Sequence, residues 1–220
     1  MNPPQMPPAW ERIAENGPLT AFFGTIIDVV KSPILFFEAL PPSGPVASVI
    51  GFWVLTTLPP MVISGISGYA FLNEMLEIVV TSPEPLLFTI PWWVFVIAAP
   101  LLQFASLLAD LCAVHVLLKM MGHARGGWSG TFRAGGYASA PAIFGYIPYV
   151  GALAGGVWMG VLQFVGLKRI HQVPTWILLL AYLLPVVVIL ILATATEIEG
   201  IVDKRSNQVG RDRFRSPLAG

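Results

Sequence analysis

Long, nearly uncharged apolar segments alternate with short polar segments along most of the chain. Residues 90–109 and residues 176–193 contain no charged side chain at all. A helix needs about 20 mostly apolar residues to cross the hydrocarbon core of a bilayer. Because lipid offers no partner to a free backbone N–H, each such segment is expected to be helical. The pattern therefore predicts several membrane-spanning helices.

These apolar segments divide into five predicted spans. The first covers residues 46–66, and the second covers residues 90–118. The stretch 137–166 is too long for one span, and it divides near residues 149–151 into a short third span and a glycine-rich fourth span. The fifth span covers residues 176–193. Prolines, which kink membrane helices, occur in the first three spans: Pro59, Pro60, Pro100, Pro141 and Pro148.

Polar segments flank this five-span domain, which we place at residues 43–194. Residues 1–17 are polar and proline-rich, which predicts a disordered tail, and residues 195–220 form a polar C-terminal tail. Between residues 18 and 42, apolar side chains recur at helical spacing opposite polar ones, which predicts amphipathic helices at the membrane interface. These helices either contact lipid directly or pack under the bundle.

The composition agrees with a membrane protein and excludes several other classes. Of the 220 residues, 55% are hydrophobic and only 11% are charged, whereas a soluble domain carries about 25% charged residues. The formal net charge is zero, so no nucleic-acid-binding surface is indicated. Cys112 is the only cysteine, and the three histidines have no adjacent carboxylates, so neither a metal site nor a cofactor is predicted. The predicted fold class is an all-α, polytopic helical membrane bundle.

The distribution of basic residues predicts the orientation in the membrane. Basic residues lie before the first span, between the second and third, and between the fourth and fifth: Arg12, Lys31, Lys119, Arg125, Arg133, Lys168 and Arg169. With five spans these segments share one side, which the positive-inside rule assigns to the cytoplasm. The N-terminus is then cytoplasmic and the C-terminus outside, although residues 195–220 also carry five basic residues.

Several side chains on this side are candidates for the cytoplasmic membrane interface: Arg125, Arg133, Lys168, Arg169 and His171. They either anchor the topology or contact anionic lipid headgroups.

Asp110 is the most informative polar residue, because a charge in the middle of a span costs on the order of 3 kcal/mol. Gln103 and Ser106 lie seven and four positions before it, so all three share one helix face. One interpretation is a proton or ion relay or a contact for a polar ligand. The other is a hydrogen-bonded aspartate that joins helices. Its candidate partners on neighbouring spans are Tyr137, Ser139 and Gln163.

Small residues in the fourth span form two Gly-x-x-x-Gly pairs, which allow close helix approach. The first pair is Gly151 with Gly155, and the second is Gly156 with Gly160. They predict tight packing, either within the monomer or between two copies of the chain.

Several short motifs occur in order along the chain: Lys31-Ser32-Pro33, Phe132-Arg133, Gly136-Tyr137-Ala138-Ser139-Ala140-Pro141, Pro148 with Gly151, Gly166-Leu167 with His171, and Pro185. In this order they resemble the Yip1 domain family of small polytopic membrane proteins. The resemblance implies a five-span fold with a cytoplasmic N-terminus. Eukaryotic members bind prenylated Rab GTPases in vesicle trafficking and carry an Asp-Leu-Tyr-Gly-Pro motif, which this sequence lacks. The resemblance is therefore to a bacterial-type member, and it indicates a fold and not a mechanism.

Two functions remain open at this point. The preferred one is a non-enzymatic membrane scaffold or adaptor in the bacterial inner membrane, organising membrane lipids, membrane protein partners or further copies of itself. The alternative is a small transporter or permease-like component that uses Asp110 as an intramembrane polar site. No catalytic arrangement of residues is recognisable, so we do not predict an enzyme.

Overall fold

The computed structural model describes residues 5–79, 91–147, 150–185, 187, 191 and 194. Every regular element in this part of the chain is a helix, which confirms the predicted all-α membrane fold. The chain divides into two units, Met1–Leu178 and Leu179–Gly220. Residues 179–185 of the second unit are helical. The predicted C-terminal tail, Pro148 and residues 80–90, between the first two predicted spans, lie outside the described residues.

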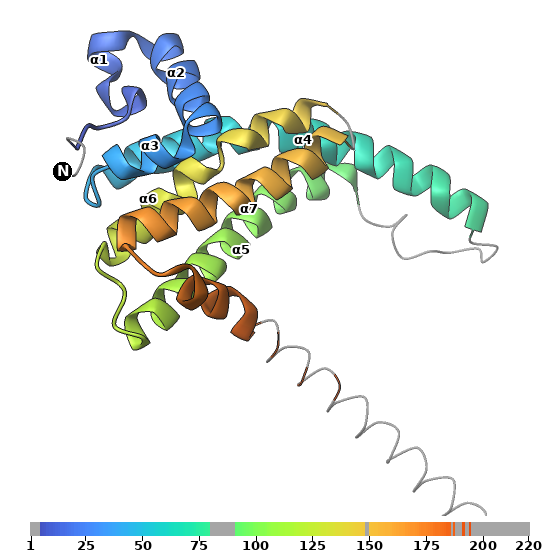
Figure 1. Cartoon of the computed structure of the whole chain (residues 1–220). Helices are drawn as coiled ribbons and strands as arrows, with labels where there is room; N and C mark the ends of the chain where they lie inside the picture. The colour runs from blue at the N-terminus through green and yellow to red at the C-terminus, as the bar shows by residue number, and fades with distance from the viewer. Residues whose placement is uncertain are drawn as a thin grey trace, which may run out of the picture. The chain divides into compact units, whose positions relative to one another are not determined.

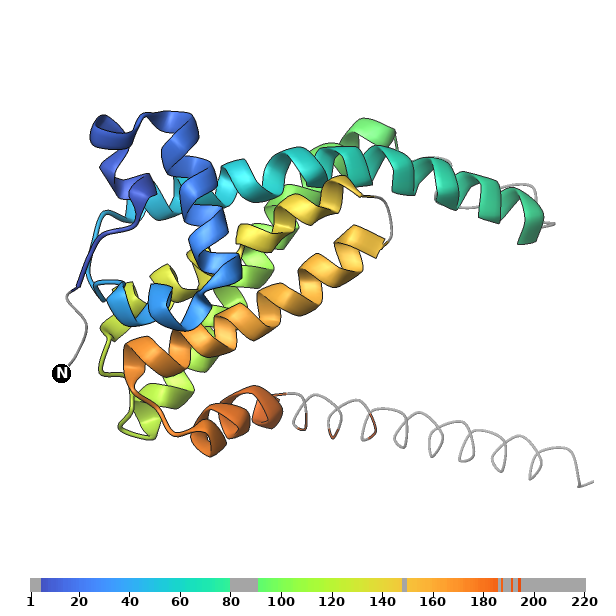
Figure 2. The same ribbon diagram turned by 45° about the horizontal axis from the view of Figure 1, so that its top comes forward.

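Three helices are long and apolar enough to cross a membrane: α4 (Val46–Val79), α5 (Trp92–Met120) and α7 (Val150–His171). They correspond to the predicted first, second and fourth spans. Helix α4 runs through both of its prolines without a break and extends beyond the predicted end of its span. Figures 1 and 2 show that it also projects past its neighbours. Within the described residues, the predicted fifth span forms a shorter apolar helix, Thr175–Pro185.

The predicted third span has a different structure. The sequence around residues 119–136 indicates a basic loop, but its second part is helix α6 (Gly127–Ala138), which is followed by a 3-10 segment, η3 (Ala140–Tyr146). Glycines permit this helix to lie against α4 and α5. A Cβ atom at Gly136 would lie 2.1 Å from Val49 Cγ1, and one at Gly135 would lie 2.6 Å from Leu111 Cδ1. Close packing therefore overrides the low helix propensity of glycine.

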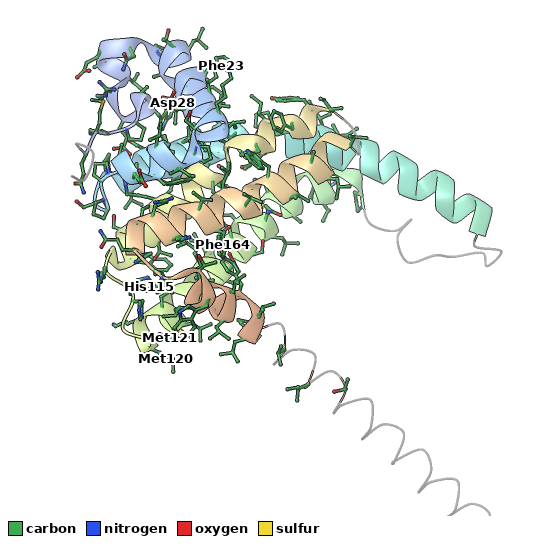
Figure 3. All side chains as sticks on the ribbon, in the orientation of Figure 1. Phe23, Asp28, His115, Met120, Met121 and Phe164 are labelled. Atoms are coloured by element: carbon green, nitrogen blue, oxygen red, sulfur yellow. The ribbon has the colours of Figure 1, made fainter. Side chains whose placement is uncertain are left out.

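Helices α2 (Pro18–Lys31) and α3 (Pro33–Ala39) correspond to the predicted amphipathic segment and meet at an angle of 115°. Taken together as one broken span, they would raise the number of candidate spans to four. Helix α3 packs against α7, with Phe37 beside Gly166. Helix α2 presents Phe23 and Asp28 to the exterior (Figure 3). The segment thus packs on the bundle and also carries exposed apolar side chains.

The N-terminal segment differs from the predicted disordered tail. Residues 9–16 form a 3-10 turn, η1 (Ala9–Arg12), and a short helix, α1 (Ile13–Asn16). Trp10 is buried, with its ring centroid 5.9 Å from that of Phe22 and 6.1 Å from that of Phe52. Its indole N–H donates to the Ser48 carbonyl oxygen at 2.6 Å. This aromatic anchor gives the proline-rich segment enough buried apolar area to be ordered.

The core lies where α2, α3, α4, α6 and α7 meet, and its buried side chains include Val29, Phe37, Phe52, Tyr137 and Leu162. Many large apolar side chains on the candidate spans point outward instead. Leu101 on α5 and Leu153 on α7, for example, are 66% and 72% exposed. Such exposure is expected where lipid, and not water, surrounds the helices.

Candidate functional site

Asp110 lies in the middle of α5 and is partly buried. The side-chain amide of Gln163, on α7, donates a hydrogen bond to its carboxylate oxygen Oδ2. Of the three candidate partners named from the sequence, Gln163 is therefore the one that contacts Asp110. The contact ties together two helices that can each cross a membrane.

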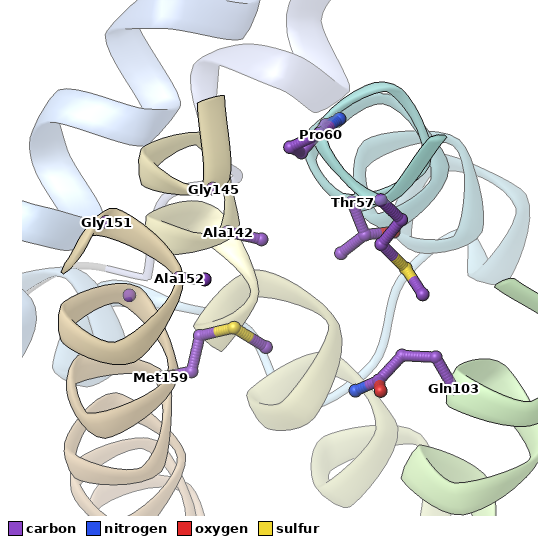
Figure 4. Close-up of a pocket in the computed structure, with 11 residues that line it drawn as sticks. Thr57, Pro60, Gln103, Ala142, Gly145, Gly151, Ala152 and Met159 are labelled. Carbon is purple, nitrogen blue, oxygen red and sulfur yellow. The ribbon is translucent and has the colours of Figure 1, made fainter. Parts of the chain in front are cut away.

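Gln103 and Ser106 lie nearer the start of α5 than Asp110, and both are exposed. Ser106 Oγ donates to the Gln103 carbonyl oxygen at 2.8 Å, within its own helix. The Gln103 side chain borders a pocket opposite Thr57 and Met159 (Figure 4). The predicted polar face is thus divided: Gln103 reaches a pocket, whereas Asp110 binds a neighbouring helix.

Tyr137 and Ser139 do not join Asp110. The Ser139 hydroxyl lies 3.0 Å from that of Thr56 on α4 and donates to the Gly136 carbonyl oxygen at 2.6 Å. The Tyr137 hydroxyl donates to Glu11 Oε1 at 2.5 Å. These two residues therefore connect α6 with α4 and with the N-terminal segment.

Arg133 is buried inside the protein and is not an exposed interfacial side chain. Its Nη1 atom lies 2.8 Å from Glu11 Oε1, and the two side chains are 1% and 5% exposed. Its Nε–H donates to the Pro41 carbonyl oxygen at 2.9 Å. A Cβ atom at position 44 would lie 2.0 Å from Nη1, so Gly44 leaves the space that the guanidinium occupies. The charge can be buried because Glu11 neutralises it.

His171 is also fully buried inside the protein, so its side chain is not exposed at the surface. The backbone N–H of Gly126 donates to its Nδ1 at 3.0 Å, so the neutral ring carries its proton on Nε2. That Nε2 lies 2.8 Å from the Thr131 hydroxyl oxygen, which lies 2.7 Å from His115 Nδ1. His171 Nε2–H therefore donates to Thr131, whose hydroxyl donates to the Gly127 carbonyl oxygen at 3.3 Å and also contacts His115 Nδ1. This chain joins α5, α6 and the end of α7.

The other predicted interfacial residues lie at the surface near the same end of the bundle. Arg125 donates to Gln172 Oε1 at 3.3 Å, and Lys168 Nζ donates to Thr175 Oγ1 at 2.8 Å. Arg169 forms an ion pair of 2.5 Å with Glu38 of α3. Nothing in the sequence pattern identifies Glu38 or Glu11 as partners, because both are distant in the sequence from the basic residues that they bind.

The two glycine pairs of α7 have different surroundings. A Cβ atom at Gly151 would lie 2.0 Å from the Phe144 carbonyl oxygen, and one at Gly155 would lie 2.7 Å from that of Pro141. Both distances are too short for a side chain, so this pair packs against η3 within the monomer. At Gly156 and Gly160 an added Cβ would meet no heavy atom within 4 Å. This second pair faces open space.

The family model of the Yip1 domain matches residues 27–196. The chain belongs to the Yip1 domain family. Comparisons with curated proteins and with solved structures give no match. The Yip1 region contains Arg133, Tyr137 and His171, whereas Glu11 precedes it. Within the described residues, no group of three or more His, Cys, Asp or Glu side chains is placed to hold a metal ion.

Proposed function

We propose that this Yip1-domain protein is a non-enzymatic membrane scaffold or adaptor that organises lipids or membrane protein partners at its basic end. The observation that carries the proposal is the buried ion pair between Glu11 and Arg133. It fastens the N-terminal segment to the membrane domain and creates a preformed surface at that end.

Further contacts of the N-terminal segment support this proposal. The Met6 N–H donates to the Ala39 carbonyl oxygen at 2.8 Å, at the end of α3. The Trp10 backbone N–H donates to Thr25 Oγ1 of α2 at 2.9 Å. With the Glu11 and Trp10 side chains, residues 6–11 reach α2, α3, α4 and α6. A surface that is ordered before binding loses less conformational entropy when a partner docks.

The charge at this end indicates the kind of partner. Lys31, Lys119 and Arg125 are exposed, and Lys168 and Arg169 lie nearby at the end of α7. Such a surface attracts anionic lipid headgroups and acidic protein segments. Under the positive-inside rule such a surface faces the cytoplasm, and we propose that the N-terminus lies on that side of a bacterial inner membrane.

Arg125 offers a direct test, because it is exposed and its described hydrogen bond is a single long one. We expect Arg125→Glu to reduce recovery of a protein partner or anionic lipid by about tenfold, which corresponds to about 1.4 kcal/mol. Arg125→Lys keeps the charge and serves as the matched control. The measurement is native mass spectrometry after gentle detergent extraction. Equal recovery with both variants, or a monomer without any bound component, would contradict the scaffold.

A small transporter is the alternative, and the observation in its favour is the intramembrane contact of Asp110 with Gln163. Asp110→Asn removes the charge but retains an amide that can bond to Gln163. A transporter predicts loss of flux in reconstituted vesicles with normal accumulation of the protein. A scaffold predicts unchanged partner recovery with this variant.

A further inference from the structure

A pocket of about 320 Å³ lies between α4, α5, η3 and α7. Figure 4 shows Thr57, Gln103 and Met159 around it, each on a different helix. Its volume is at the lower end of the range for small-molecule sites. Gln103, Ala152 and Gly156 border it and are exposed, so the pocket is open to the exterior of the bundle.

The pocket lies at the end of the bundle opposite the basic residues. Thr57 and Met61 are close to the end of the apolar part of α4, whereas Gln103 and Gly156 are close to the start of the apolar parts of α5 and α7. The basic residues Lys119 and Lys168 follow at the other ends of α5 and α7. The pocket thus opens within membrane-spanning segments, where acyl chains are the surrounding solvent.

The lining is more apolar than polar. Among the described residues of the lining, Thr57 and Gln103 have the only polar side chains, and the Thr57 hydroxyl already donates to the Trp53 carbonyl oxygen at 2.6 Å. The Gln103 amide has no hydrogen-bond partner among the described residues. The pocket therefore suits an apolar occupant with one acceptor or donor, and no described residue of its lining carries a charge for an ionic ligand.

One side of the pocket is closely packed, and other parts of its lining can adapt to a ligand. Gly151 and Gly155 hold α7 against the backbone of η3, so this wall is rigid. At Gly156 no heavy atom lies within 4 Å of the Cβ position, which leaves the space open. Met61 and Met159 contribute flexible thioether chains, which adjust to an irregular apolar ligand.

We propose that this pocket binds one acyl chain of a membrane phospholipid and that the Gln103 amide donates a hydrogen bond to its ester carbonyl oxygen. The depth of Gln103 agrees with this contact. The apolar part of α5 has 25 residues, or about 37 Å, so Gln103 lies about 7 Å inside a hydrocarbon core of about 30 Å. Its long side chain reaches towards the ester layer. This binding goes beyond the scaffold function and does not depend on it.

Photolabelling tests the acyl-chain site. The full-length protein is reconstituted in phosphatidylethanolamine–phosphatidylglycerol vesicles with a phosphatidylethanolamine that carries a diazirine in one acyl chain. We expect labelling of peptides that contain Met61 and Met159. Gly156→Phe fills the pocket and should reduce this labelling by about tenfold, or about 1.4 kcal/mol. Gly160→Phe is the matched control, because position 160 is equally open but does not line the pocket.

Two results would overturn the proposal. One is equal labelling of the Met61 and Met159 peptides in both phenylalanine variants. The other is a crosslink between two copies of the chain at these peptides, which would identify a protein as the occupant.

An ether-linked phospholipid isolates the role of Gln103, because it has the same chains but no ester carbonyl. We expect the unlabelled ester lipid to compete with the photoreactive lipid about threefold better than its ether analogue, in line with one hydrogen bond. In Gln103→Leu the two lipids should compete equally. Equal competition in the unmodified protein would overturn the contact with Gln103.

Discussion

The two ends of the membrane bundle are built in different ways. At the basic end, side chains bind one another: Arg133 pairs with Glu11, and His171 reaches His115 through Thr131. At the opposite end, glycines bring the backbones of α7 and η3 together, and a pocket remains beside them. One end is held by directional polar contacts, and the other by close backbone packing.

This difference follows from what each kind of contact requires. A buried polar group is costly unless its partner is in place, so a polar network has to be complete. Apolar space beside a bilayer carries no such requirement, because an acyl chain can fill it without any hydrogen bond. The basic end is therefore suited to a fixed surface, and the opposite end to a replaceable lipid.

Removal of one partner from the ion pair should have the largest effect. Glu11→Ala leaves Arg133 buried without a counter-charge, which costs about 3–5 kcal/mol. We expect the apparent Tm in detergent, measured by tryptophan fluorescence, to fall by about 6–20 °C.

The double variant Glu11→Leu with Arg133→Met is the control, because it removes both charges and retains apolar volume. It should recover to within about 1–2 kcal/mol of the parent protein. A double variant that is no more stable than Glu11→Ala would mean that the polar contact itself, and not the unpaired charge, accounts for the loss.

At the opposite end, Gly151→Ala should destabilise the protein by about 2–3 kcal/mol, because the new Cβ would lie 2.0 Å from a carbonyl oxygen of η3. The same fluorescence-detected melting curves measure this loss. An unchanged Tm would show that η3 can move away from α7 at little cost, and the wall of the pocket would then not be rigid.

Thr131→Val tests the histidine chain with a nearly isosteric side chain. Loss of the hydroxyl leaves His171 Nε2 and His115 Nδ1 without their partner, and we expect a cost of about 1–3 kcal/mol. Thr175→Val is the matched control, since its hydroxyl accepts an exposed bond from Lys168 and should contribute less than about 0.5 kcal/mol. Equal effects of the two variants would argue against a tightly coupled polar network.

The smallest expected effect is a gain in stability. At Gly160→Ala the new methyl group meets no atom within 4 Å, and replacement of glycine by alanine stabilises a helix by about 0.5–1 kcal/mol. A rise in Tm of about 1–4 °C is expected. A fall would indicate that a second copy of the chain packs on this face.

Local sequence patterns were sufficient to predict much of the fold. Runs of apolar residues identify α4, α5 and α7, since each span needs only its own length and apolarity. The position of Asp110 on α5 reduced its candidate partners to three, and Gln163 is among them. Such features depend on residues that are close in the sequence or on the same helix face.

The features that the sequence did not predict depend on contacts between residues that are far apart in the sequence. Arg133 has the sequence context of a surface loop, and its counter-charge in the buried site, Glu11, comes from a different element. Helix α6 contains four glycines, and its stability comes from contacts with Val49 and Leu111 that no local pattern indicates. Trp10 orders a proline-rich segment through rings on α2 and α4.

The contact between Glu11 and α6 also constrains the biosynthesis of the protein. Glu11 and Tyr137 are 126 positions apart, so a ribosome that adds about 5–20 residues per second needs about 6–25 s to pass from one to the other. During that interval the Glu11 carboxylate has to stay in an aqueous compartment, because its partners do not yet exist. Two membrane insertions, those of α4 and α5, separate the partners in time. The ion pair can therefore form only after α4, α5 and α6 have all been synthesised.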